Sequence, residues 1–193
     1  MVESSAAASQ VAQRPASTQL LKRSSAHGSW LSCPMSASSS PIFTWERRVE
    51  FAETDAAGIV HFSSFFVYME QAEHALFRHC GWTIFPQQRS DPRASLYTWP
   101  RVHCSCDYKA PAFFEDILSI DVSIERMGTK SMTYRHVIRR GPQIIALGLV
   151  TSVCSKVDPV NHQISSSVIP EEYRTKFQSL IDASGTAPSN ISH

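Results

Sequence analysis

Apolar and polar residues alternate along most of the chain between Thr44 and Val157, and this pattern predicts a protein built mainly from strands. In the first such segment Trp45, Val49 and Phe51 share one parity. The alternation predicts five strands, over residues 44–52, 96–109, 116–126, 131–140 and 143–157. The last four are separated by connections of hairpin length, so we expect them to run antiparallel.

Two segments have helical spacing instead. Residues 63–79 place apolar side chains near one stripe, with Ser63 or Ser64 available as an N-cap and Gly81 as a stop. A short closing helix is expected to open at Pro170. The order of elements predicts an α+β fold, a five-stranded antiparallel sheet wrapped around one long helix. Its free sheet edges favour pairing with a second copy.

Composition divides the chain of 193 residues into one domain and two tails. Residues 1–40 contain 12 Ser, 7 Ala and no sustained apolar period, which predicts a disordered tail. Such a segment also fits an organelle transit peptide, or a mis-set start with translation beginning at Met35. We expect the folded domain over residues 41–181 and a second disordered tail over 182–193.

Charge and cysteine content exclude several classes of function. The formal net charge is +1, so no global field attracts nucleic acid or an anionic membrane. No apolar run is long enough to span a bilayer. The five cysteines contain no C-x-x-C pair, which argues against a disulfide framework or a zinc site and favours a reducing compartment such as the cytoplasm. No phosphate loop, metal-ligand cluster or nucleophile elbow is present, so neither a metal nor another cofactor is expected.

The segment most informative about chemistry is 49–66, where an acid-bearing loop runs into the start of the predicted long helix. The first amides of a helix lack intrahelical partners and carry partial positive charge, so they can polarise a carbonyl and hold an oxyanion. Asp55 lies just ahead of them as a potential nucleophile or general base, and Gly58 allows a close backbone turn. Taken alone, an Asp in this setting is ordinarily a turn former.

The string Glu53-Thr54-Asp55-Ala56-Ala57-Gly58-Ile59-Val60 resembles the signature acid-x-Asp-x-x-Gly-Ile/Val-Val of the 4-hydroxybenzoyl-coenzyme A thioesterase family, which has the hot-dog fold. The resemblance continues through Tyr68-Met69-Glu70 and Cys80-Gly81 and covers about residues 44–175. It implies a hot-dog domain that hydrolyses acyl- or aroyl-coenzyme A and assembles as a homotetramer.

The resemblance also implies roles for particular residues. Asp55 would be the catalytic carboxylate, and the backbone amide near Phe62 would polarise the thioester carbonyl. The loop Tyr97-Thr98-Trp99-Pro100 would complete the substrate pocket, with Thr98 and Trp99 beside the acyl group, although these aromatics could equally belong to the core. His61 stands where family members have Tyr or Trp, and it is either a substrate contact or a rim residue without a catalytic task.

A basic stretch runs from Arg126 to Arg140 without an acidic residue. Coenzyme A carries a pyrophosphate and a 3′-phosphate, which such a cluster can bind. The family resemblance points to Lys130, Ser131 and Arg135 for this task. A solvated strand face is the alternative, and for the arginines beside the Gly141-Pro142 turn it is the favoured interpretation.

The leading hypothesis is therefore an acyl-coenzyme A thioesterase that releases the free acid and coenzyme A, with no nucleic-acid partner. One alternative is a non-catalytic module that only binds acyl groups, since fold alone does not decide function. A hot-dog hydratase or dehydratase is the other, but it would carry a Gly/Pro-rich loop after a His, which His61-Phe62-Ser63-Ser64 lacks.

Overall fold

The computed structural model describes residues 40–82, 97–158 and 163–185. The chain divides into two units, Met1–Met35 and Ser36–His193, and every described residue belongs to the second. The predicted tails therefore lie outside the described residues, apart from residue 40 and residues 182–185.

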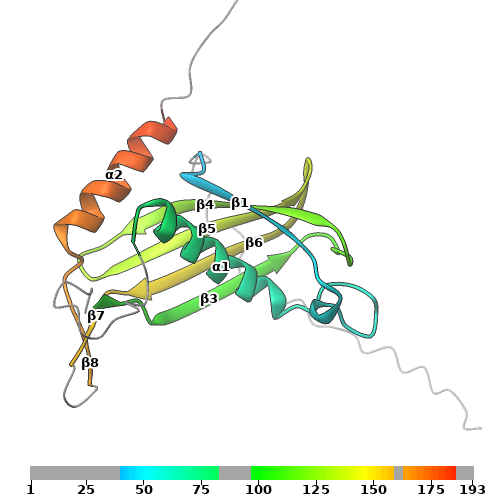
Figure 1. Cartoon of the computed structure of the whole chain (residues 1–193), viewed down its shortest axis with the longest axis horizontal. Helices are drawn as coiled ribbons and strands as arrows, with labels where there is room; N and C mark the ends of the chain where they lie inside the picture. The colour runs from blue at the N-terminus through cyan, green and yellow to red at the C-terminus, as the bar shows by residue number, and fades with distance from the viewer. Residues whose placement is uncertain (1–39, 83–96, 159–162, 186–193) are drawn as a thin grey trace, which may run out of the picture. The chain divides into compact units, whose positions relative to one another are not determined.

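A five-stranded antiparallel sheet forms the centre of the fold, as the alternation predicts. Its strands are β1 (Phe43–Arg48), β3 (Arg101–Tyr108), β4 (Ile117–Met127), β5 (Ser131–Arg140) and β6 (Gln143–Val153). They lie in the order β1-β4-β5-β6-β3, so β1 and β3 are the edges (Figure 1). In the chain, η1, α1 and the short strand β2 lie between β1 and β3.

Helix α1 (Ser64–His79) crosses one face of this sheet and confirms the predicted long helix (Figure 1). The side chains it buries recur about one helical turn apart, among them Phe65, Tyr68, Met69, Ala72 and Leu76. Alternate residues of β5 are buried beneath it, so one stripe of the helix and one face of the sheet form the core. At Gly148 in β6 a side chain would collide with Met69, so glycine allows the helix to lie close to the sheet.

The structure corrects the bounds of three predicted strands. The first strand ends at Arg48 rather than residue 52, and Phe51–Glu53 form a 3-10 helix, η1. The predicted strands 96–109 and 143–157 each break in two. Their outer parts join a separate three-stranded sheet made of β2 (Tyr97–Thr98), β7 (Ser155–Val157) and β8 (Ile164–Ser166). Strand β8 was not predicted, because its three residues are all exposed and show no alternation.

Helix α2 (Glu171–Gly185) follows Pro170 as predicted, and it continues past residue 181, where we expected the domain to end. It buries Tyr173 and Phe177. These two rings meet Phe77, Trp82 and Trp99 in an aromatic cluster near the end of α1. In the described parts of the chain, no helix has both the length and the apolar character needed to cross a bilayer.

Candidate active site

The loop between η1 and α1 is a small hairpin with Asp55 near its neck. Thr54 pairs with Val60, and the Asp55 N–H donates to the Ile59 carbonyl at 2.9 Å. The Gly58 N–H donates back to the Asp55 carbonyl at 2.9 Å, and Gly58 has a φ of 76°, the left-handed region that disfavours residues with a Cβ. The close turn expected at Gly58 is therefore present.

The Asp55 side chain forms the turn that the cautious interpretation of the sequence anticipates. Its Oδ1 accepts a hydrogen bond from the Ala57 N–H at 2.8 Å. Its Oδ2 has no partner among the described residues, and the side chain is only half-buried. A carboxylate oxygen is thus available for chemistry while the other one fixes the orientation of the group.

The Phe62 amide lies one residue before Ser63, the N-cap residue of α1. The neighbouring amides are occupied, since the His61 N–H donates to Glu53 and the Ser64 N–H donates to His61. In the part of the chain that the structure describes, the Phe62 N–H has no acceptor. Its carbonyl accepts from the Tyr108 hydroxyl at 3.0 Å, which holds this peptide in place. An unpaired amide at a helix start can donate to a substrate oxygen.

Ser63 is the N-cap residue of α1, as predicted, but its side chain makes no capping hydrogen bond. The Ser63 Oγ lies 2.8 Å from His61 Nδ1, and the Ser64 Oγ donates to the Glu53 carbonyl at 3.2 Å. The Ser63 N–H also donates to His61 Nδ1. His61 therefore orders the helix entrance through Nδ1, and its half-buried ring lies against Phe62.

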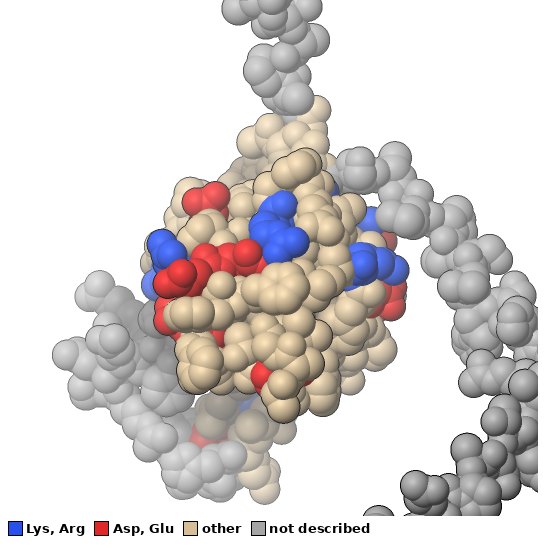
Figure 2. Space-filling model, turned by 90° about the vertical axis from the view of Figure 1, so that its right-hand side faces the viewer, with Lys and Arg blue, Asp and Glu red and all other residues tan. Residues whose placement is uncertain are grey.

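The surface around this loop is mainly uncharged. Figure 2 faces the end of the molecule that carries the loop and shows uncharged residues over most of the described surface that is visible from this side, with acidic and basic groups in a few places. Large exposed apolar side chains on this loop and on the segment between β3 and β4 include Phe51, Phe62, Phe113 and Phe114. Such a surface suits an apolar substrate group or a partner subunit.

Comparison with known proteins supplies the family. A model of the thioesterase superfamily matches residues 57–146. The 1,4-dihydroxy-2-naphthoyl-CoA hydrolase of Synechococcus sp. (strain CC9605) is 33% identical over 119 residues, which make up 60% of this chain and 78% of that protein. The chain belongs to the thioesterase superfamily.

Two further relatives agree with this thioesterase assignment. The 4-hydroxybenzoyl-CoA thioesterase of Pseudomonas sp. (strain CBS-3) is 29% identical over 97 residues, or 50% of this chain and 67% of that protein. The solved structure of a gentisyl-coenzyme A thioesterase has a TM-score of 0.60 and 27% identity, and the match covers 70% of this chain and 99% of that one. The predicted family, hot-dog fold and enzyme class, a thioester hydrolase, are confirmed.

Not all of the predicted thioesterase site residues lie together. Trp99 is 6% exposed and packs against Phe77 and Tyr173, as the core alternative predicts. Phe77 follows the start of α1 by 13 residues, or about 20 Å along the helix axis. Thr98, in β2, lies beside Trp99 in the chain. Within one chain these residues are at the opposite end of α1 from Asp55.

The predicted phosphate-binding residues also lie away from the loop. Ser131 is the first residue of β5 and Lys130 directly precedes it, with the Lys130 Nζ 3.5 Å from the Ser166 Oγ. The Asp55 loop lies at the other end of that strand, because Ile59 pairs with Phe113 and the nearby Asp116 binds Arg140. The β5 strand spans roughly 30 Å.

Arg135 and Arg139 of β5 occupy the outer face of the sheet, and each has an acidic partner. Arg135 lies 3.9 Å from Glu125, and Arg139 lies 3.1 Å from Asp121. Ser131, Arg135 and Arg139 share the face that points away from α1. These partners reduce the positive charge that the basic stretch offers to a phosphate.

One polar cluster was not predicted. Glu73 projects from the apolar face of α1 and is 3% exposed, with its Oε2 2.8 Å from Arg101 and its Oε1 3.5 Å from His136. Burial raises the pKa of Glu73 to about 7 and lowers the pKa of His136 to about 3. The signal in the sequence was an acidic residue one turn after Met69 and one turn before Leu76.

Proposed function

We propose that this thioesterase hydrolyses an acyl- or aroyl-CoA at the Asp55 loop, with Asp55 as the catalytic carboxylate and the Phe62 N–H as the donor to the thioester oxygen. The observation that carries the proposal is the hairpin that holds, at one helix start, a carboxylate oxygen and an amide that have no partner among the residues described. The names of three relatives, each a thioesterase or hydrolase of a hydroxylated aromatic acyl-CoA, support an aroyl substrate.

Two routes use these groups. In the first, Asp55 takes a proton from water as the water oxygen attacks the carbonyl, and collapse breaks the C–S bond so that the CoA thiolate recovers the proton. In the second, a carboxylate oxygen attacks and expels the thiolate, and water hydrolyses the mixed anhydride to restore Asp55. In both, negative charge develops on the oxygen that the Phe62 N–H faces.

The test is Asp55→Asn assayed on aroyl-CoA and acyl-CoA thioesters, with Asp182→Asn as the matched control. Asp182 is exposed on α2, away from the loop. We expect the turnover of Asp55→Asn to fall at least about a hundredfold with little change in thermal stability, because the turn needs only one acceptor and the chemistry needs a carboxylate. If this variant turned over at the wild-type rate, Asp55 would serve only to form the turn.

The turn at Asp55 also favours one alternative, a module that binds acyl groups without cleaving them. In that case the Oδ1 contact with Ala57 would be the whole task of the side chain. The same assay separates the two functions, since a binding module would retain acyl-CoA in equilibrium dialysis without releasing free thiol.

For the nucleotide we propose Lys130, Ser131 and Arg135 as phosphate contacts, and His61 as a substrate contact at the loop. Lys130 and Asp55 lie at opposite ends of β5, so we infer that the nucleotide and the thioester are bound with help from a second subunit. Trp99 is buried and Thr98 lies beside it in the chain, at the opposite end of α1 from Asp55, so in our proposal these two residues support the fold at that end rather than bind the acyl group.

The proposed assembly is a homotetramer that forms from edge-paired dimers. Strand β3 has only β6 as a neighbour among the described strands, and its exposed residues include Val102 and Tyr108. Pairing of two β3 edges would cover them. We also propose a reducing, cytoplasmic setting, because Cys80, Cys104, Cys106 and Cys154 are all free thiols.

A further inference from the structure

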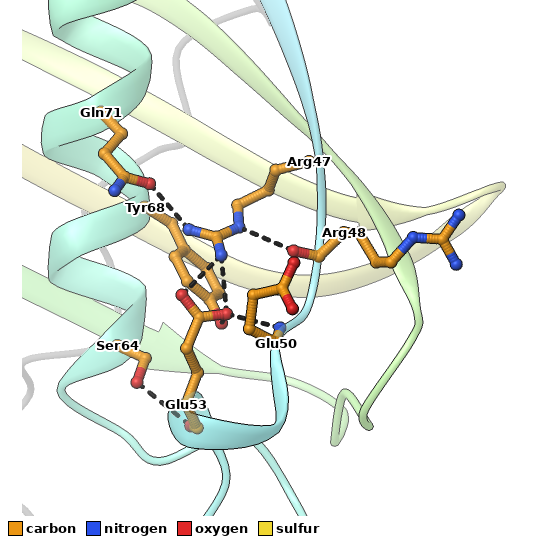
Figure 3. Close-up of polar contacts among 7 residues, drawn as sticks. All are labelled: Arg47, Arg48, Glu50, Glu53, Ser64, Tyr68 and Gln71. Atoms are coloured by element: carbon orange, nitrogen blue, oxygen red, sulfur yellow. Dashed lines mark hydrogen bonds and ion pairs between the residues drawn. The ribbon is translucent and has the colours of Figure 1, made fainter.

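Glu53, two residues before Asp55, contacts three of the elements beside the loop. Its carboxylate Oε2 accepts a charge-assisted hydrogen bond from Arg47 of β1 at 2.6 Å. The same oxygen accepts a hydrogen bond from the Tyr68 hydroxyl of α1 at 2.9 Å (Figure 3). The Glu50 N–H donates to the same Oε2 at 2.8 Å. One side chain thus joins the first strand, η1 and the long helix.

The backbone of Glu53 closes the neck of the hairpin. Its carbonyl accepts the His61 N–H at 2.8 Å and the Ser64 hydroxyl at 3.2 Å. His61 directly precedes the unpaired Phe62 amide. Glu53 therefore contacts both the outgoing strand of the hairpin, which leads to Asp55, and the returning strand, which leads to Phe62.

The partners of the Glu53 carboxylate are themselves restrained. Arg47 is 10% exposed, its guanidinium lies 4.0 Å from the centre of the Tyr68 ring, and it also donates to Gln71 at 2.7 Å. Burial, and then the hydrogen bond to Glu53, raise the pKa of Tyr68 above its usual range, so the hydroxyl stays protonated and remains a donor. Arg47 and Tyr68 are therefore themselves held in place. Together with Glu53 they form a clamp.

We propose that Glu53 is a positioning residue of the thioesterase reaction, which fixes the Asp55 carboxylate relative to the Phe62 amide. This inference rests on the proposed function of those two groups. Charge-assisted, bidentate hydrogen bonds fix the orientation of a side chain as well as its distance from its partner. A small displacement of reacting groups is enough to lower a rate by orders of magnitude, so a clamp at the neck of the hairpin controls turnover without touching the substrate.

The first experiment compares Glu53→Gln with Glu46→Gln. Glu46 lies on β1 next to Arg47 in the chain but on the exposed face of the strand. Glutamine cannot accept from Arg47, Tyr68 and Glu50 at once, and it lacks the charge. We expect Glu53→Gln to lower kcat by about tenfold to a hundredfold with KM within about twofold, measured well below the Tm of each protein. Glu46→Gln should keep wild-type kinetics.

The second experiment separates positioning from a purely structural role. In the Asp55→Asn background, Glu53→Gln should cause no further loss of the residual rate, because there is no carboxylate left to position. If instead both losses multiply, Glu53 supports the fold and the proposal is overturned. It is also overturned if Glu53→Gln alone turns over like the wild type while Asp55→Asn is inactive, an outcome that leaves the proposed function intact.

Tyr68→Phe provides the same test if Glu53→Gln does not fold. It removes a single donor and keeps the buried ring, so we expect a loss in kcat of about threefold to tenfold that disappears in the Asp55→Asn background. A wild-type kcat in Tyr68→Phe would count against the clamp. Failure of the proposed function looks different from all of these, since the unmodified protein would then release no thiol from any CoA thioester.

Discussion

At the scale of single residues, Glu73 and His136 show how burial decides which form of a side chain the fold tolerates. Desolvation raises the pKa of the Glu73 carboxyl even though Arg101 acts in the opposite direction. Desolvation, with a smaller contribution from Arg101, lowers the pKa of His136. Between about pH 3 and pH 7 both groups are therefore neutral in the folded protein. The His136 Nε2 lies 3.5 Å from the Glu73 Oε1 in the core.

This pair gives the free energy of unfolding an unusual dependence on pH. The folded state binds the Glu73 proton more tightly than the unfolded state does, so stability is lost as pH rises from 4.5 through about 7. The folded state binds the His136 proton more weakly, so stability is lost as pH falls from 6.5 through about 3. From pH 4.5 to 6.5 the two effects cancel.

We predict that Glu73→Gln removes the cancellation. Its free energy of unfolding should rise between pH 4.5 and 6.5 by about 2 to 3 kcal/mol relative to the wild type, because only the His136 effect remains. Urea denaturation across this range measures the difference. Glu46→Gln, at an exposed position, should run parallel to the wild type, and a parallel curve for Glu73→Gln would contradict the prediction.

At the scale of the elements, the outer face of β5 tests how the nucleotide is bound. Lys130→Ala should raise the KM for a CoA thioester more than it lowers kcat, because a phosphate contact contributes equally to the ground state and the transition state. We expect a change in KM of about threefold to thirtyfold, which salt should reduce. Arg135→Ala should act in the same direction, but less strongly, because Glu125 already pairs with Arg135.

The control substrate is the N-acetylcysteamine thioester of the same acid, which lacks the nucleotide. Wild type and Lys130→Ala should hydrolyse it equally. Lys176→Ala, on exposed α2, serves as the control variant and should leave both substrates unaffected. Equal losses on both substrates would show that Lys130 supports β5 and β8 instead, through its contact with Ser166.

At the scale of the whole molecule, the free edge of β3 predicts assembly. Val102 is 62% exposed on this strand. We expect light scattering to show an oligomer, with a tetramer as the final state. Val102→Lys should shift it toward smaller species and lower the activity at nanomolar concentration, because a charge on an edge strand opposes pairing. Val168→Lys, exposed outside the described strands and helices, is the control. A wild-type monomer with full activity would contradict both assembly and the shared site.

Local sequence signals predicted the elements in which hydrophobic residues recur at a regular spacing. The alternation over residues 131–140 became β5, and the helical spacing over 63–79 became α1, because each pattern is set by neighbours within one element. The breaks at the ends of β3 and β6 were missed because local alternation continues through them. What divides those segments is that their outer parts, β2 and β7, pair with each other, and that β7 also pairs with β8. These pairings bring together residues far apart in the chain.

The sequence by itself determined the family, the main sheet with its long helix and the loop that carries Asp55, since a short string and local periodicity contain all three. Only the tertiary structure placed Arg47 and Tyr68 on Glu53, and Arg101 and His136 around Glu73. It also separated Trp99 from the loop by the length of α1. These relations join side chains from different elements, and the burial that sets their charges and partners exists only after the helix has covered the sheet.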